Sequence, residues 1–231
     1  MTVVAVIPAY NEGKTIKKVL EATMPNVDKI VVIDDGSIDD TYDKAVEIAT
    51  HVISYRTNKG FGIAFKKGVE KAMQIGADWI VALDADGEHN PQEIPKLLNA
   101  AKQKNADVVL GSRFLRNGEA VKMPFIKLAS NAISTLMFIL LYRVKLTDSQ
   151  SGFRVYKRRV FELINCSQNG LLLNTEMLIA STKLGLKLVE VPIISISSGR
   201  KFGNHQFKEI VAYPLLLVRG YGKKFSSEKQ S

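Results

Sequence analysis

The sequence predicts a single α/β domain with a mixed, mostly parallel sheet and helices on both of its faces. Three observations support this prediction. Short apolar runs of strand length alternate with stretches in which apolar residues recur at helical spacing. Several runs end in acidic or glycine-containing loops, which is where open α/β sheets bind their ligands. The chain of 231 residues is 46% hydrophobic, so it can bury a substantial core.

Six apolar runs are expected to form strands in a sheet of roughly seven, and the run at 51–55 is expected at its periphery. Gly60 and Gly62 precede the expected helix at 64–73. The rest of a dinucleotide-binding fingerprint and a Walker-type lysine are missing there, which excludes a Rossmann dehydrogenase and a P-loop NTPase. The expected strands are residues 2–7, 30–33, 51–55, 79–83, 107–110 and 188–194.

Acidic residues crowd the ends of two of these runs. Asp34 and Asp35 follow the second run, where a carboxylate can accept hydrogen bonds from a nucleotide base or a ribose. Asp39 or Asp40 is expected to cap the next helix, because aspartate is a favoured N-cap residue.

The fourth run is followed by Asp84, Asp86 and Glu88, which are spaced two residues apart. Their carboxylates would bring hard oxygen ligands together at the mouth of a loop, a ligand set that suits Mg²⁺ or Mn²⁺ better than Zn²⁺. The alternative is that Asp84 and Asp86 cap the helix that begins near Pro91.

Charge is distributed unevenly along the chain. Residues 1–104 hold 13 Lys and Arg against 15 Asp and Glu, a net charge of −2, whereas residues 105–231 hold 19 against 8, a net charge of +11. The basic half could face nucleic acid, an anionic membrane or a phosphorylated substrate. A nucleic-acid-binding module is disfavoured, because the basic segments lack the interleaved aromatic residues of a single-strand binder.

The expected compartment follows from the cysteine count and the N-terminus. Cys166 is the single cysteine, so no internal disulfide can form. No basic stretch with a hydrophobic signal core precedes the first strand, so export is not expected. Both observations agree with a cytoplasmic location.

Two uncharged apolar stretches lie in the basic half, at 128–142 and 210–218. The first spans 15 positions, which is short of a transmembrane helix. It is interpreted either as a core helix or, with Lys127, Arg143 and Lys145 beside it, as a helix that lies at a membrane interface.

Five motifs occur in order along the chain, and together they are more specific than any one alone. They are Pro8-Ala9-Tyr10-Asn11-Glu12, Asp34-Asp35-Gly36-Ser37, Asn58-Lys59-Gly60, Asp84-Ala85-Asp86 and Gly111-Ser112-Arg113-Phe114. This succession resembles the family 2 glycosyltransferases of the GT-A fold. More narrowly, it resembles the polyprenyl-phosphate (dolichyl-phosphate) mannosyl- and glucosyltransferases. The resemblance extends from residue 2 to about residue 205.

The resemblance implies a GT-A domain at 1–222, with a donor half at 1–104, an acceptor half at 105–222 and a polar tail at 223–231. It implies that a hexose moves from a nucleotide diphosphate sugar of the GDP-mannose or UDP-glucose type to a polyprenyl phosphate, with inversion at the anomeric carbon. The implied nucleotide-binding residues are Pro8, Ala9, Tyr10, Glu12, Asp34, Asp35, Lys59, Asp84, Ala85 and Asp86.

The same resemblance implies a divalent cofactor, Mg²⁺ or Mn²⁺, held by Asp84 and Asp86. Such an ion would stabilise the negative charge that builds on the diphosphate leaving group. Many polyprenyl-phosphate enzymes have glutamine where this chain has Glu88. The acid at this position is therefore a candidate third ligand.

In the acceptor half, Asp148 and Glu176 are the implied candidates for a general base. Two structural alternatives stand beside these roles: Asp148 could pair with Arg154, and Thr175 could cap a helix that begins near Glu176. The implied phosphate-binding residues are Arg113, Lys127, Arg154 and, on a basic loop, Arg200.

A lipid acceptor implies that the chain works at the cytoplasmic face of a membrane, either alone or with a separate membrane subunit. The second candidate function is a glycosyltransferase of the same fold that acts on a hydroxyl acceptor. That reaction would depend on Asp148 or Glu176 as a base, because a hydroxyl is a weaker nucleophile than a phosphate at neutral pH.

Overall fold

The computed structural model describes residues 1–115, 125–170, 172–196 and 204–222. The strands are β1 (Val3–Ala9), β2 (Lys29–Asp34), β3 (His51–Ser54), β4 (Trp79–Ala82), β5 (Val108–Ser112), β6 (Arg154–Lys157) and β7 (Leu188–Pro192). The α-helices are α1 (Ile16–Thr23), α2 (Thr41–Val46), α3 (Phe61–Gln74), α4 (Ile94–Gln103), α5 (Phe125–Tyr142), α6 (Arg158–Leu163), α7 (Leu172–Lys183) and α8 (Asn204–Gly222). Two short 3₁₀ helices, η1 (Met24–Asn26) and η2 (Pro91–Glu93), also lie in these described ranges.

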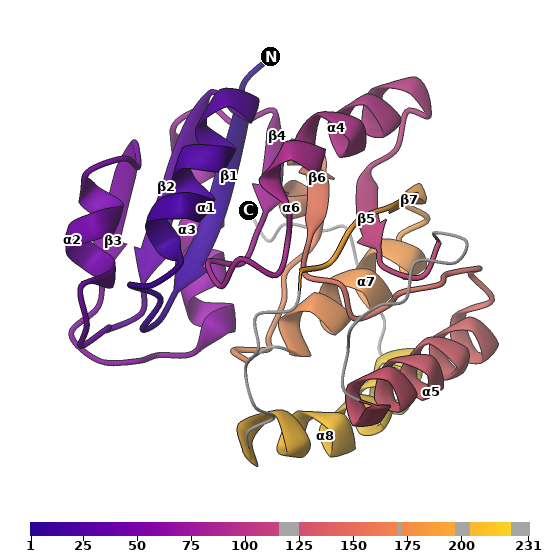
Figure 1. Cartoon of the computed structure of the whole chain (residues 1–231). Helices are drawn as coiled ribbons and strands as arrows, with labels where there is room; N and C mark the ends of the chain where they lie inside the picture. Colours follow the sequence, from indigo (N-terminus) through magenta and orange to yellow (C-terminus); the bar gives the residue numbers. More distant parts are fainter. Residues whose placement is uncertain (116–124, 171, 197–203, 223–231) are drawn as a thin grey trace, which may run out of the picture.

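The seven strands form one mixed sheet in the order β3-β2-β1-β4-β6-β5-β7 (Figure 1). β6 runs antiparallel to β4 and β5, and the other pairs are parallel. The predicted mixed, mostly parallel sheet is therefore confirmed, with β3 at its periphery as expected. β1 and β4 lie side by side near its centre. Their carboxyl ends bring the first loop and the acidic loop together.

Side chains of β1 alternate between the two faces of the sheet, as the pleat requires. Ala5 and Ile7 enter a core with residues of α1, α2 and α4. Val4 and Val6 enter a second core with residues of α3, α7 and α8. Because both faces are covered by helices, the central strands are almost wholly apolar.

β6 is the strand that the hydrophobic pattern did not predict. Its four residues begin with Arg154 and end with Lys157, so no apolar run marks it. The Arg154 side chain is fully buried and donates hydrogen bonds to the carbonyl oxygens of Ser149 (3.0 Å), Ser151 (2.7 Å) and Asn174 (2.7 Å). Arg154 therefore neither pairs with Asp148 nor presents its guanidinium to an acceptor, which corrects both interpretations made from the sequence.

Two helix starts also differ from expectation. α7 begins at Leu172, so Thr175 lies inside the helix and does not cap it. Before α4, the side chain of Asn90 accepts from the backbone N–H of Gln92. The cap at η2 is thus an asparagine, and Asp84 and Asp86 are free of that role. The N-cap residue of α2 is Asp40, whose side chain makes no capping hydrogen bond, whereas Asp39 accepts from the Thr41 N–H at 3.1 Å.

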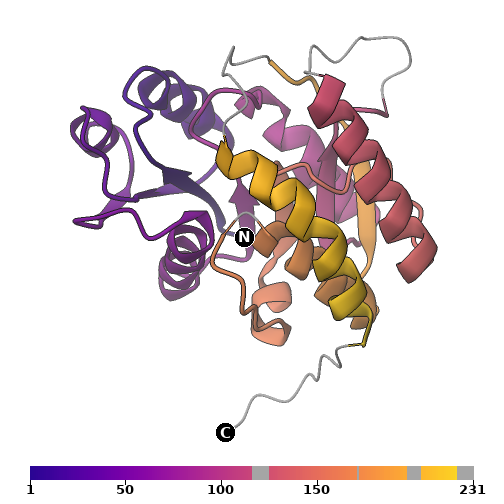
Figure 2. The same ribbon diagram turned by 90° about the horizontal axis from the view of Figure 1, so that it is seen from below.

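α5 and α8 pack against each other and against α7, on the outside of the second core (Figure 2). The inward face of α5 is mostly polar, because Ser130, Asn131, Ser134 and Thr135 are buried there beside Phe138. Most of its large apolar residues face outward instead, and Leu140 is 69% exposed. Phe138 nevertheless lies in the second core, and Met137, Leu141 and Tyr142 pack against it. The core-helix interpretation of 128–142 therefore holds for one side of the helix, and the membrane-interface interpretation of the other side stays a prediction.

We expect replacement of Arg154 to destabilise the fold. Arg154→Met keeps the length of the side chain but removes the donors to three buried carbonyl groups, each of which costs about 1–3 kcal/mol when left unpaired. The free energy of unfolding, measured in urea, should fall accordingly. Lys67→Met, which removes an exposed ion pair with Glu70, is the control and should change it by about 1 kcal/mol or less. Equal stability of the two variants would contradict the structural role of Arg154.

Candidate active site

The loops that follow β1 and β2 are hydrogen-bonded to each other at the carboxyl edge of the sheet. The Asp35 N–H donates to the Ala9 carbonyl at 2.8 Å, and the Asn11 N–H donates to the Ser37 hydroxyl at 2.9 Å. Asn11 has a positive φ of 55°, a conformation that asparagine tolerates better than most residues. These contacts fix the first motif against the second.

Asp34 and Asp35 are buried, and their carboxylates organise the surrounding loops. Asp34 accepts from the Ser37 N–H at 3.1 Å and from the Ser54 hydroxyl at 2.7 Å. Asp35 accepts from the N–H groups of Lys59 and Gly60 at 2.7 and 2.8 Å. The third motif is thereby attached to the second. A direct contact of either acid with a nucleotide stays a prediction.

The remaining residues of the predicted donor site gather around these loops. Tyr10 is 46% exposed and Lys59 is exposed, so both side chains reach the surface of the site. Glu12 is buried, and its backbone N–H donates to the Thr41 hydroxyl at 2.7 Å. Pro8 and Ala9 form the end of β1, and Ala9 and Ala85 are buried beneath the loops.

The acidic loop follows β4 directly. Asp86 accepts from the Glu88 N–H at 2.9 Å, which closes a tight turn. The Asp84 side chain is 36% exposed, and its Oδ2 lies 3.6 Å from Nδ1 of the buried His89. Gly152, from the segment before β6, lies against the same carboxylate, since a Cβ placed there would come within 2.8 Å of Asp84 Oδ2. The glycine leaves room for the carboxylate.

Electrostatics at this loop favour a bound cation. Partial burial, followed by repulsion from Asp86, Glu88 and Glu12, raises the pKa of Asp84 to about 7, and Arg113 opposes the shift. Burial and the charge of Arg113 lower the pKa of His89 to about 4, so its imidazole is uncharged at neutral pH. A cation between the carboxylates would relieve their repulsion.

The oxygen donors fit a divalent ion such as Mg²⁺ or Mn²⁺. In the part of the chain that is described, no group of three His, Cys, Asp or Glu side chains is arranged as a metal site. An ion at Asp84 and Asp86 would therefore complete its shell with donor phosphates and water, as Mg²⁺ commonly does. Ligation by Glu88 stays a prediction.

Arg113, at the end of β5, forms a two-point ion pair with the fully buried Asp148. Its Nε and Nη2 donate to the two carboxylate oxygens at 2.7 and 2.9 Å. Asn131 of α5 donates to the same carboxylate at 2.7 Å. Although burial opposes ionisation, the hydrogen bonds and charge of Arg113 hold the pKa of Asp148 below its usual value. Asp148 thus orients Arg113, and its proton-accepting capacity is low.

Glu176 is also buried, and it serves the segment before α7. Its carboxylate accepts from the N–H groups of Ser167 and Gln168 and from the Ser167 hydroxyl, each at 2.8 Å. These contacts give Glu176 a structural task and provide no support for a role as base. The Lys127 side chain and Arg200 lie outside what the structure describes.

Three residues near the site were not singled out by the sequence. Asn131 lies in an apolar stretch, Gly152 in a turn, and His89 directly after the acidic motif. Only His89 carried a signal that could have been used, because its imidazole directly follows three candidate metal ligands, Asp84, Asp86 and Glu88. The other two become visible when distant segments come together.

We expect Arg113 and Asp148 to be coupled in stability. Asp148→Asn or Arg113→Met leaves one charge in a nearly closed site, and such a change costs about 3–5 kcal/mol. The double variant removes both charges and should cost clearly less than the sum of the two single changes. Urea unfolding of all four proteins gives the coupling energy. If the two single changes in unfolding free energy simply added up in the double variant, Arg113 and Asp148 would not be coupled in stability.

The chain is similar in sequence to known glycosyltransferases. Residues 4–164 match the family model of Glycosyl transferase family 2. The chain is 34% identical over 211 residues to the UDP-N-acetylglucosamine–dolichyl-phosphate N-acetylglucosaminyltransferase of Methanococcus voltae, covering 83% of this chain and 84% of that one. It is 32% identical over 204 residues to the undecaprenyl-phosphate mannosyltransferase of Micrococcus luteus, covering 84% and 83%.

The fold is shared with a solved glycosyltransferase. Glucosyl-3-phosphoglycerate synthase from Mycobacterium tuberculosis, in complex with Mn²⁺, UDP-glucose and phosphoglyceric acid, superposes with a TM-score of 0.76. The match covers 96% of this chain and 80% of that one at 21% identity, which establishes the fold alone. From the family match and the two relatives, this chain belongs to the family 2 glycosyltransferases and has the GT-A fold.

Proposed function

We propose that this enzyme moves a hexose from a nucleotide diphosphate sugar to a polyprenyl phosphate at a membrane surface, with inversion at the anomeric carbon. The observation that carries the proposal is the position of Arg113. Its charge interacts with Asp84 of the acidic loop, and Asp148, to which it is hydrogen-bonded, is also bonded to Asn131 of α5. The two relatives, whose names specify lipid-phosphate substrates, support the choice of acceptor.

The proposed reaction needs little from a base. An oxygen of the acceptor phosphate forms a bond to the anomeric carbon while the bond from that carbon to the donor diphosphate breaks, and the nucleoside diphosphate leaves with the electron pair. A phosphate is already nucleophilic at neutral pH. This agrees with Asp148 and Glu176 being engaged in hydrogen bonds to other groups.

Each part of the proposed site has a separate task. The loops after β1 and β2 would hold the nucleotide, and Arg113 would orient the acceptor phosphate through its remaining donor capacity. Asp84 and Asp86 would hold a divalent ion, which supplies charge neutralisation for the leaving diphosphate. Positioning and charge neutralisation would then account for most of the rate.

A donor screen tests the proposal directly. The purified chain is incubated with a short polyprenyl phosphate, with Mg²⁺ or Mn²⁺, and in turn with GDP-mannose, UDP-glucose and UDP-N-acetylglucosamine. Transfer of sugar to the lipid phosphate from one of these donors is the expected result. Transfer only to a sugar hydroxyl supplied in parallel would favour the hydroxyl-acceptor function instead.

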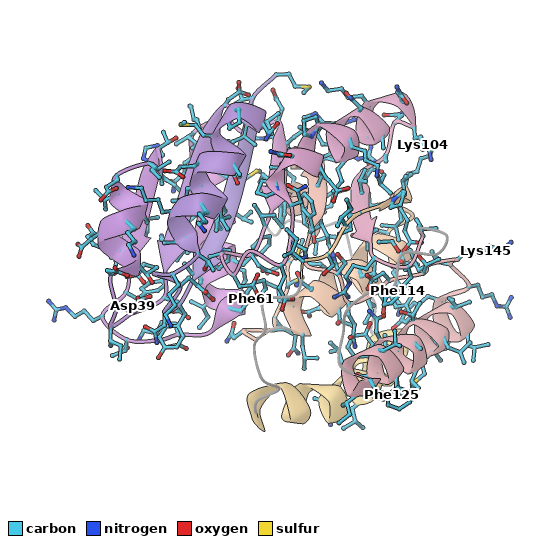
Figure 3. All side chains as sticks on the ribbon, viewed as in Figure 1. Asp39, Phe61, Lys104, Phe114, Phe125 and Lys145 are labelled. Carbon is cyan, nitrogen blue, oxygen red and sulfur yellow. The ribbon has the colours of Figure 1, made fainter. Side chains whose placement is uncertain are left out.

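The apolar face of α5 and α8 is proposed to rest on the bilayer. Among the described residues, no helix has the length and apolar character needed to cross a membrane. Both helices nevertheless carry several exposed large apolar residues. Arg143 and the outward-pointing Lys145 follow shortly after α5 (Figure 3). The net charge of +11 in residues 105–231 favours an anionic lipid surface. The exposed apolar residues of this face are Phe125, Ile126, Leu128, Ile133, Leu136, Leu140, Leu215, Val218 and Tyr221.

We expect the divalent ion to be essential. Asp84→Ala or Asp86→Ala should lower turnover by at least about 100-fold, because the charge on the leaving diphosphate would no longer be neutralised. The fold should persist, since a loop carboxylate contributes little packing. Asp43→Ala, at an exposed carboxylate on α2, is the matched control and should retain activity. Full activity in excess chelator would contradict the metal site.

We expect the double variant Leu136→Ser and Leu140→Ser to weaken membrane binding. Each leucine should contribute about 1 kcal/mol at an interface, less than full burial would give. Co-sedimentation with phosphatidylglycerol-containing vesicles measures the effect, and binding by the unmodified chain should decrease as salt rises. Val46→Ser, which replaces an exposed apolar residue on α2, is the control.

Alternatively, a second copy of the chain could cover the exposed apolar face of α5 and α8, and the same variant tests this. Sedimentation velocity would show a dimer that dissociates in the double variant. A dimer of this kind, together with no vesicle binding, would overturn the membrane assignment and leave the sugar-transfer assignment to the donor screen.

A further inference from the structure

We propose that His89 is a positioning residue that holds the Asp84 carboxylate in the orientation required by a divalent ion. The inference rests on the proposed function, because it assumes that Asp84 is a metal ligand. It concerns a side chain behind that ligand, which neither the acidic motif nor its spacing identifies.

The first observation is that His89 is buried with an unused polar atom. Its side chain is 5% exposed, and Nδ1 has no hydrogen-bond partner among the described residues. A buried nitrogen without a partner costs free energy, so such an atom is uncommon unless the site is completed by a further group or a small movement. The nearest acceptor is Asp84 Oδ2, at 3.6 Å.

The second observation is that the imidazole is held firmly from the other side. Its ring lies on Phe153 with centroids 5.4 Å apart. His89 also forms an isolated β-bridge with Ser195, and the neighbouring Glu88 carbonyl accepts from the Ile196 N–H at 2.9 Å. The ring and the backbone that carry Nδ1 are therefore fixed, whereas Asp84 lies on a partly exposed loop.

Because the imidazole is fixed, the movement that would close the 3.6 Å gap is expected from the Asp84 side chain. A shift of about 0.5 Å would bring its Oδ2 within hydrogen-bonding distance of Nδ1. The Nδ1–H form of the neutral imidazole would then donate to one carboxylate oxygen, and the other oxygen would face the ion. Ligating carboxylates are commonly oriented by such outer contacts.

His89 is placed to support the ligand and not to bind the ion itself. Nδ1 has essentially no accessible surface, whereas the Asp84 side chain is 36% exposed. An ion that approaches from solvent with the donor diphosphate would meet the carboxylate first. Gly152 lies against Oδ2 as well, so the carboxylate is confined between the glycine and the imidazole.

Three substitutions at His89 separate the hydrogen bond from the packing. His89→Phe keeps a ring on Phe153 and removes both nitrogens. His89→Asn places an amide N–H near the position of Nδ1, and His89→Gln places its amide near the other ring nitrogen. Thermal unfolding of each variant checks that the fold is retained.

The readout is Mn²⁺ affinity, which needs no turnover. Free Mn²⁺ is measured by electron paramagnetic resonance during titration of the full chain, in excess UDP and, in parallel, in excess GDP. His89→Phe and His89→Gln should weaken Mn²⁺ binding by about 10- to 100-fold, and His89→Asn should recover most of the loss. Bound Mn²⁺ should show no direct coupling to a histidine nitrogen.

Asp84→Ala makes the possible failures distinguishable. If Asp84→Ala abolishes Mn²⁺ binding while His89→Phe binds with unchanged affinity, the role of His89 is overturned and the metal site stands. If His89→Asn is as weak as His89→Phe, the hydrogen bond is not the cause and the inference fails. If Asp84→Ala binds Mn²⁺ normally, both the inference and the proposed metal site are wrong.

Discussion

The segment at 147–152, in which Asp148, Ser149 and Ser151 are buried, is the constraint on which the arrangement of the site depends. The buried Arg154 guanidinium donates hydrogen bonds to this segment, at the carbonyl oxygens of Ser149 and Ser151. Glu190 of β7 accepts from the N–H groups of Thr147 and Asp148 at 2.8–2.9 Å. A segment with so many buried polar groups is tolerated only because nearly every one has a partner. Its conformation is consequently narrowly defined.

This segment connects three parts of the molecule that are distant in sequence. Asp148 orients Arg113 at the end of β5, and Gly152 lies against Asp84 at the end of β4. The Ser149 hydroxyl contacts Thr135 of α5 and accepts from Tyr213 of α8, both at 2.9 Å. The acidic loop, the arginine and the two helices with the exposed apolar face therefore share one support. A displacement of the segment would disturb all three together.

Much of the donor half could be predicted from the sequence, because its information is local. Each buried strand there is an apolar run, and the acids that follow it must emerge at the same edge of the sheet. β6 could not be predicted in this way. It starts with Arg154, whose burial is possible only when the carbonyl oxygens of Ser149, Ser151 and Asn174 converge on it. The pairing of Arg113 with Asp148 likewise joins residues 35 positions apart.

The polar residues of α5 face inward, which is the reverse of what their helical spacing would indicate for a helix in water. Its polar residues recur at helical spacing, which in a helix surrounded by water would mark the outer face. Here Asn131 and Thr135 turn inward, because the 147–152 segment offers hydrogen-bonding partners that water would otherwise supply. Once the polar stripe is used inside, Ile133, Leu136 and Leu140 must face outward. The exposed apolar face is thus a consequence of the polar core beneath it. A membrane or protein that covers this face would therefore contact a helix that is linked to Arg113 by hydrogen bonds through Asn131 and Asp148.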